Sequence, residues 1–147
     1  MKVYRISNKK YTEHLNGEGV YRVGGRWNSK GILMVYTSTS IALASLEVLV
    51  HTDGIPIPNG MILLTFEVPN KYIQTLDNPP LNWDETPPKG AAKIVGDEFI
   101  KSNKVLGIKV PSAIIPEEYN LLINPIHMHM DKIEIVSRRD YAFDGRL

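Results

Sequence analysis

The chain has 147 residues, of which 43% are hydrophobic and 22% are charged, and this composition is typical of a soluble globular domain with a real core. Its 17 lysines and arginines almost balance its 16 aspartates and glutamates, which argues against a general nucleic-acid binder. The absence of cysteine excludes disulfides and thiolate metal sites. We expect a cytoplasmic protein, because the N-terminus lacks a signal-peptide core and no uncharged apolar run reaches the roughly 18 residues of a membrane span.

Hydrophobic alternation and the spacing of turn residues predict about six strands along the chain. Strands are expected at Lys2 to Ile6, Ile32 to Thr37, Met61 to Val68, Val105 to Val110 and Lys132 to Ser137. A turn followed by a short apolar piece is expected at Pro116 to Asn124.

Two or three helices are expected between these strands. Ser38, Thr39 and Ser40 offer N-cap hydroxyls for a helix that runs to about His51. Pro88 can open a second helix, which runs through roughly Ser102. Two stretches rich in glycine or proline are expected to be loops, Tyr11 to Gly31 and Asn78 to Pro88. No repeat or linker divides the sequence, so we expect one domain over 1–147 with an α+β fold and mostly antiparallel strands.

The expected helix SIALASLEVLVH is apolar on nearly all sides and contains a single carboxylate, Glu47. A helix of this kind is normally buried. An ionised carboxylate in a buried helix costs several kcal/mol unless it is paired or hydrogen-bonded. His51 lies one turn further on the same face and is one potential partner, and an arginine from a neighbouring loop is another. From the chemistry alone, a catalytic and a structural role for Glu47 are about equally supported.

A second stretch, YRVGGRWNSKG, places Arg22, Arg26 and Lys30 four residues apart in a glycine-rich segment. Glycine lets backbone amides approach an anion closely, and the planar fork of arginine matches phosphate oxygens. This pattern suggests a phosphate-bearing ligand. A glycine-rich hairpin with solvated arginines is the commoner explanation, because the stretch is neither a Walker loop nor a GxGxxG motif.

Joined together, GGRWNSKGILMVYTSTSIALASLEVLVH resembles the core signature of RES-domain proteins, the toxins of Xre–RES toxin–antitoxin systems. The family is named for an arginine, a glutamate and a serine, which here match Arg26, Glu47 and Ser112. Tyr36 matches the functional tyrosine of the family, and Arg5, in the opening VYRI, matches a second arginine. The later stretches LNWDETPP, GDEF, VPS and NLLINPIH extend the resemblance over essentially the whole chain, with phenylalanine in place of tryptophan in the family's GDxW.

The resemblance implies an ADP-ribosyltransferase-like α+β fold in a single RES domain, 1–147. It implies that NAD+ is the substrate, that its nicotinamide–ribose bond is cleaved, and that water, phosphate or a protein is the acceptor, with no metal. It also implies an Xre-type antitoxin as partner, which covers the active site and carries the DNA binding of the complex, so that DNA is contacted only indirectly. No membrane partner is implied, and the oligomeric state stays open, a homodimer included.

The resemblance also implies a role for each matched residue. Glu47 would hold the 2′-hydroxyl of the nicotinamide ribose and stabilise the oxocarbenium character that develops during cleavage. Arg26 and Arg5 would clamp the pyrophosphate or the neighbouring ribose. Tyr36 would stack on, or hydrogen-bond near, the nicotinamide ribose. Ser112 would hydrogen-bond the nicotinamide carboxamide or the backbone around Glu47.

Other interpretations remain open at the level of the sequence. Without the resemblance, Tyr36 is more simply a core aromatic and Ser112 a turn serine. His127 and His129 would share one face of an extended segment, but they lack a third ligand, so a structural or interface role is favoured over a metal. Trp27 is expected to pack under the arginine loop. Two rival functions are an RNA-directed toxin or nuclease and a non-catalytic interaction domain.

Overall fold

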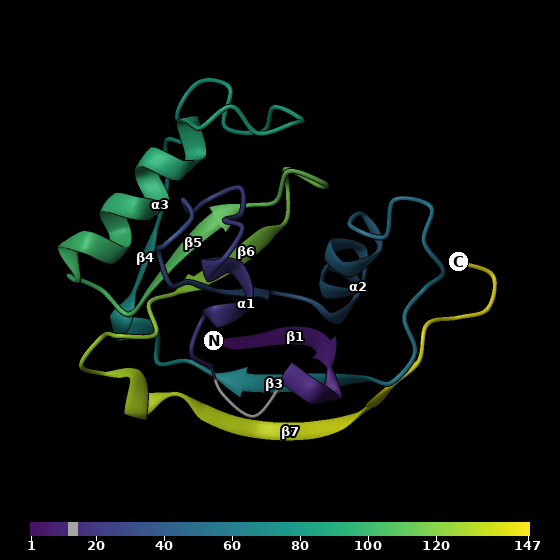
Figure 1. Ribbon diagram of the computed structural model, residues 1–147. Helices are drawn as coiled ribbons and strands as arrows, with labels where there is room; N and C mark the ends of the chain where they lie inside the picture. Colours follow the sequence, from purple (N-terminus) through teal and green to yellow (C-terminus); the bar gives the residue numbers. More distant parts are fainter. Residues whose placement is uncertain (12–14) are drawn as a thin grey trace.

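The protein was analysed as a computed structural model, which describes residues 1–11 and 15–147 (Figure 1). Within these residues, the strands are β1 (Lys2–Asn8), β2 (Val35–Ser38), β3 (Met61–Glu67), β4 (Ile73–Thr75), β5 (Gly107–Pro111), β6 (Tyr119–Ile123) and β7 (Glu134–Tyr141). The α-helices are α1 (Glu18–Tyr21), α2 (Ile41–Leu49) and α3 (Ala91–Ser102). Single 3-10 turns are η1 (Lys9–Tyr11), η2 (Asn70–Tyr72) and η3 (Met130–Lys132).

All strands join one sheet in the order β4-β5-β6-β2-β1-β3-β7, and every neighbouring pair is antiparallel except β4 with β5. Strand β2 is the junction of this sheet. It pairs with β6 along its whole length, but its register with β1 rests on Tyr4 opposite Ser38. Strands β5 and β6 therefore run obliquely to β1, β3 and β7 (Figure 1), as expected of a strongly twisted sheet.

The core lies on both faces of the sheet. Strand β3 is buried on both faces, which explains why its sequence MILLTFE is a continuous apolar run instead of an alternating one. One face carries the cluster of Val3, Val35, Ile62, Leu64, Phe66, Val68, Leu106, Leu121 and Ile123. On the other face, α2 packs with Ile6, Met61 and Leu63. Helix α3 packs through Phe99 and Ile100 against Ile108 and Val110 of β5. The two longer helices therefore cover two neighbouring parts of the sheet.

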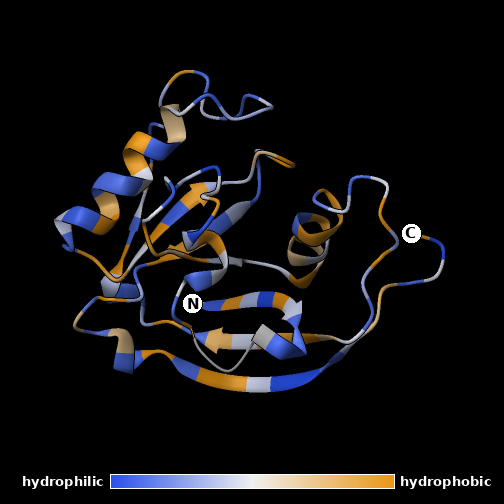
Figure 2. Ribbon diagram, in the orientation of Figure 1, coloured by the Kyte–Doolittle hydropathy of each residue, from blue (hydrophilic) through white to orange (hydrophobic). Residues whose placement is uncertain are grey.

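Helix α2 begins where the sequence predicts, because the Ser40 hydroxyl accepts a hydrogen bond from the Leu43 amide at 3.0 Å. The expectation that this helix is buried on nearly all sides is wrong. Only Leu43, Ala44 and Ser45 are buried, whereas the side chains of Ile41 and Val50 are 36% and 56% exposed. Figure 2 shows that the ribbon of α2 is largely coloured as hydrophobic. Periodicity located the helix but could not show which of its apolar sides meets the sheet.

Most other expected elements are present with shifted ends. Helix α3 starts at Ala91 instead of Pro88, because Gly90 has a left-handed conformation with φ of 105°. The apolar piece expected after Pro116 is strand β6, and the three-residue strand β4 was not expected. The expected loop from Tyr11 to Gly31 contains the short helix α1, and residues 12–14 of that loop lie outside the described residues. Over 1–11 and 15–147, no helix has both the length and the apolar character needed to cross a membrane.

Candidate active site

Glu47 lies on the sheet-facing stripe of α2, since Leu43 and Ala44, four and three residues before it, are both buried. Its Oε1 atom accepts hydrogen bonds from Asn120 Nδ2 at 2.6 Å and from Ser112 Oγ at 3.1 Å. Within the described residues, neither His51 nor any arginine bonds to this carboxylate. Two neutral donors on β5–β6 therefore replace the ion pair considered from the sequence.

Both donors are themselves held in place. The Ser38 hydroxyl donates to Asn120 Oδ1 at 2.8 Å, and the two residues face each other across β2 and β6. This bond fixes the amide of Asn120 with its NH2 group toward Glu47. Ser112 is fully buried, and its Oγ accepts hydrogen bonds from the amides of Ile114 at 3.1 Å and Ile115 at 3.4 Å. One carboxylate oxygen of Glu47 is thus anchored, while Oε2 receives no hydrogen bond from the residues described.

Arg26 is bound to the proline-rich excursion that precedes α3. Its Nη1 donates to the carbonyls of Trp83 at 3.1 Å and Glu85 at 2.8 Å, and its Nη2 contacts Thr86 Oγ1 at 3.4 Å. The next residue, Trp27, is buried and stacks on Trp83 with ring centroids 5.7 Å apart. As expected, Trp27 packs beneath the arginine loop. Only part of the Arg26 guanidinium is used by these contacts, since no acceptor for its Nε is seen among the described residues.

Tyr36, on strand β2, is hydrogen-bonded to the arginine loop. Its hydroxyl donates to Asn28 Oδ1 at 2.7 Å and accepts the Trp27 amide hydrogen at 3.0 Å. Burial raises the pKa of Tyr36, the hydrogen bond from the Trp27 amide lowers it, and the negative charge of Asp97 raises it. The hydroxyl therefore stays protonated near neutral pH and serves as a hydrogen-bonding group for the loop backbone.

Arg5 is placed differently. It lies opposite Leu64 in the register of β1 with β3, on the face of β1 that carries Val3, whereas Ile6 faces α2. Burial lowers the pKa of Arg5, and its Nη2 lies beside Gly19, where an added Cβ would be 3.9 Å away. No hydrogen bond or ion pair to Arg5 is found within the described residues. The structure therefore does not bring Arg5 into contact with Glu47, but it leaves a half-buried cation that an anion would stabilise.

The two histidines of the sequence HMH lie in a turn and not in an extended segment. His129 stacks on Tyr72 at a centroid distance of 4.2 Å, and His127 Nδ1 accepts the His129 amide hydrogen at 3.1 Å. These contacts support a structural role for both rings.

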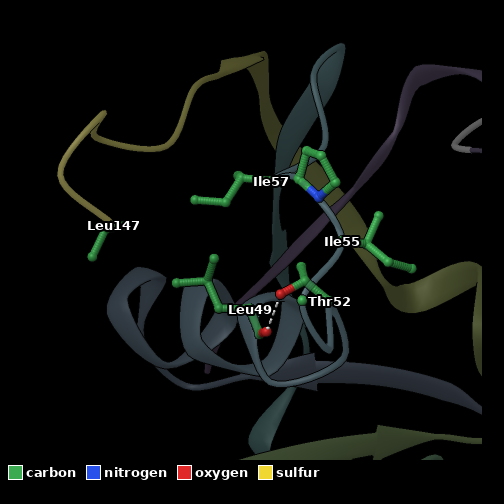
Figure 3. Close-up of a pocket in the computed structure, with 7 residues that line it drawn as sticks. Leu49, Thr52, Ile55, Ile57 and Leu147 are labelled. Carbon is green, nitrogen blue, oxygen red and sulfur yellow. Dashed lines mark hydrogen bonds between the residues drawn. The ribbon is translucent and has the colours of Figure 1, made fainter.

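A hollow of about 610 Å³ lies away from these residues, at the end of α2 (Figure 3). Leu49, Thr52, Ile55, Ile57 and Leu147 line it, and Thr52 Oγ1 donates to the Leu49 carbonyl at 2.8 Å (Figure 3). None of the site residues expected from the sequence lines this hollow. Its aliphatic lining lacks the charged groups that a phosphate-bearing ligand requires.

Sequence reasoning assigned no role to Asn120 or Asn28 and considered Ser38 only as a possible N-cap, whereas these residues hold Glu47 and Tyr36. A signal for Asn120 existed, because it opens the stretch NLLINPIH that belongs to the family resemblance. Asp97 also lacked a role, although the pair Gly96-Asp97 stands in the GDEF motif. Its carboxylate accepts hydrogen bonds from the amide and the hydroxyl of Ser29.

The comparisons with known proteins identify the family of this chain. The sequence model of the RES domain family matches residues 2–144, and the chain belongs to this family. The chain is 36% identical to a protein named Toxin Res from Photorhabdus laumondii over 151 aligned positions, which cover 100% of this chain and 97% of that protein. It is 35% identical to the Prs ADP-ribosylating toxin of a Sphingobium species, over 92% of this chain and 87% of that protein.

A solved structure shares the fold. A chain of the crystal structure of the MbcT–MbcA toxin–antitoxin complex of M. tuberculosis superposes with a TM-score of 0.78 and 19% sequence identity. The match covers 96% of this chain and 84% of that one. The expected fold class is confirmed: the protein is α+β and ADP-ribosyltransferase-like, with a mostly antiparallel sheet and few helices.

Proposed function

We propose that this RES-domain protein is a toxin of a toxin–antitoxin system, which binds NAD+ and cleaves its nicotinamide–ribose bond. The observation that carries the proposal is the state of Glu47. Its carboxylate is anchored through Oε1 by Asn120 and Ser112, and its Oε2 receives no hydrogen bond from the described residues. A half-buried acid that is oriented by neutral donors, and not neutralised by a cation, is suited to stabilise positive charge on a substrate.

The reaction requires such a group. Departure of nicotinamide leaves oxocarbenium character at the anomeric carbon of the ribose. Nicotinamide leaves from NAD+ as a neutral molecule, so no strong acid is needed to protonate it. Glu47 Oε2 would accept the hydrogen bond of the ribose 2′-hydroxyl and place negative charge beside the developing cation. Because its position is fixed before the reaction, little reorganisation is needed in the transition state.

The arginines would bind the diphosphate of NAD+. Arg26 is held in place by the Trp83 and Glu85 carbonyls, and no carboxylate among the described residues forms an ion pair with its guanidinium. Arg5 is half-buried without a partner among the described residues, and an anionic oxygen would offset the cost of that partial burial. Tyr36, whose hydroxyl is engaged with the Asn28 side chain, would contribute its ring as a surface for the nicotinamide ribose.

A protein side chain is one acceptor that a specific observation favours. The relative from Sphingobium, 35% identical to this chain, is named an ADP-ribosylating toxin. Transfer to a protein uses the same cleavage step, since only the nucleophile that attacks the anomeric carbon changes. Water and inorganic phosphate are the two other acceptors.

The partner would be an antitoxin of the Xre type that covers the active site and provides the DNA-binding surface of the complex. The exposed Val50, three residues after Glu47 and so on the same side at the end of α2, supports a protein partner beside Glu47. We place the protein in the cytoplasm, where NAD+ is abundant.

The test is incubation of the purified protein with NAD+, with and without inorganic phosphate or a cell extract, followed by mass identification of the products. Nicotinamide with ADP-ribose would identify a hydrolase, and ADP-ribose 1″-phosphate a phosphorylase. A mass increase on an extract protein would identify a transferase. Absence of nicotinamide release under all three conditions would contradict the proposed function.

A further inference from the structure

Helix α3 is joined to the arginine loop by one carboxylate, that of Asp97. Its Oδ1 accepts the amide hydrogen of Ser29 at 2.8 Å, and its Oδ2 accepts the Ser29 hydroxyl hydrogen at 2.5 Å. Both carboxylate oxygens are thus used by the same residue, and within the described residues no cation pairs with them. Hydrogen bonds to an ionised acceptor are about twice as strong as neutral ones. The two hydrogen bonds between Asp97 and Ser29 therefore hold helix α3 firmly to the loop.

The residue before Asp97 brings the helix and the loop into backbone contact. A Cβ added at Gly96 would lie 1.6 Å from the carbonyl oxygen of Trp27. Only glycine therefore lets α3 approach the loop this closely. Because of this approach, the short side chain of Asp97 reaches both polar groups of Ser29. Gly96 therefore allows the short distance between helix and loop, and the hydrogen bonds of Asp97 maintain it.

The four residues 26–29 form a unit whose every member is held from outside. Trp27 is buried and stacked on Trp83. Asn28 is fully buried, accepts the Tyr36 hydroxyl hydrogen, and donates to the Ile32 carbonyl at 2.9 Å. Only two residues, Trp27 and Asn28, separate Ser29 from Arg26, so a shift at Ser29 is transmitted through a tightly packed segment.

We infer that Asp97 is a positioning residue, which holds the loop 26–29 through Ser29 and thereby places the Arg26 guanidinium for the diphosphate of NAD+. This inference rests on the proposed function. Both oxygens of Asp97 bind Ser29, and its negative charge would repel the diphosphate, so Asp97 would act through the loop and not on the substrate itself. Its loss therefore weakens binding through Arg26 and leaves the chemistry at Glu47 nearly intact.

A kinetic experiment separates this role from a purely structural one. Asp97→Ala is expected to raise KM for NAD+ about tenfold or more, with kcat within about threefold of the wild type, because it displaces a group that binds the substrate away from the reacting carbon. Asp97→Asn keeps an acceptor and a polar atom facing Ser29 and is expected to restore KM to within about threefold. Glu98→Ala, the matched control, removes a neighbouring exposed carboxylate and leaves both constants unchanged.

Two further variants show whether the effect passes through the loop. In an Arg26→Lys background, Asp97→Ala is expected to raise KM by less than about threefold, because the group that it positions is already lost. Ser29→Ala removes one of the two hydrogen bonds and is expected to give an intermediate KM. This variant replaces Asp97→Ala in the experiment if Asp97→Ala does not fold. An unchanged KM in Asp97→Ala or Ser29→Ala, or the same increase in KM with and without Arg26, would overturn the inference.

A second readout does not depend on activity. The chain contains 2 tryptophans, and both belong to the Trp27–Trp83 stack at this loop. Quenching of their fluorescence by acrylamide is expected to increase in Asp97→Ala but not in Glu98→Ala, since Trp27 is only 2% exposed in the native loop. If the wild type releases no nicotinamide from NAD+, the proposed function fails, whereas the hold on the loop is still judged by quenching. Unchanged quenching in Asp97→Ala would refute that hold.

Discussion

Replacing Gly96 by alanine sets helix propensity against packing. Alanine is about 1 kcal/mol better than glycine in a helix interior, so an isolated α3 would gain stability. In the protein, the new Cβ would lie 1.6 Å from the Trp27 carbonyl oxygen and 2.7 Å from the Trp27 carbonyl carbon. Helix and loop must then separate by about 1.4 Å to restore a contact of 3.0 Å. Both contacting groups are backbone, so no side-chain rotation can relieve the overlap.

We expect this overpacking to cost about 3 kcal/mol and to exceed the gain in propensity, which leaves a net loss of about 2 kcal/mol. Such a loss lowers the melting temperature by roughly 4–8 °C in a domain of this size. Urea unfolding gives the free energy directly. Gly107→Ala is the matched control, because its Cβ would be 3.1 Å from the flexible end of the Leu121 side chain, and its effect should stay within about 1 kcal/mol. A Gly96→Ala protein as stable as the wild type would refute the reasoning.

Two other predictions concern a site contact and a surface contact. Asn120→Asp should lower kcat for NAD+ cleavage more than Asn120→Ala, because the new carboxylate would repel that of Glu47, even though aspartate is closer to asparagine in shape. Faster nicotinamide release in Asn120→Asp than in Asn120→Ala would contradict the role of Asn120 as a donor to Glu47. The hydrogen bond and charge of Lys9 lower the pKa of Asp140, so this contact stabilises the folded state above the pKa of an unfolded aspartate and is lost as the pH falls through the lowered value. Lys9→Met should therefore cost a small, salt-sensitive amount of stability at neutral pH and nothing in strong acid; an equal loss at both pH values would contradict the assignment.

The fold was largely predictable where local patterns decide it. Strand β3 and the start of α2 followed from a continuous apolar run and an N-cap serine. Strand β4 was not predicted, because a strand of three residues is too short to show a periodic pattern. Its parallel partner β5 lies more than 30 residues further along the chain, so no local pattern indicates their pairing. The burial of α2 was overestimated because periodicity does not reveal which apolar stripe faces the sheet.

The sequence supplied candidates for the site, but it could not supply their contacts. The carboxylate of Glu47 bonds to residues 65 and 73 positions away, and Arg26 bonds to carbonyls 57 and 59 positions away. No local spacing connects such partners. The resemblance to the RES family named Glu47, Arg26 and Ser112, whereas the bond between Ser112 and Glu47 required the three-dimensional structure.

The central claim is that the anchored carboxylate of Glu47 stabilises the transition state of nicotinamide release. The most direct measurement compares single-turnover nicotinamide release and NAD+ binding in the wild type and in Glu47→Gln, with Glu98→Gln as control. The account predicts that Glu47→Gln releases nicotinamide roughly 10²–10³ times more slowly while its Kd for NAD+ changes only a few fold. A Glu47→Gln protein that is folded, binds NAD+ and releases nicotinamide at the wild-type rate would contradict it.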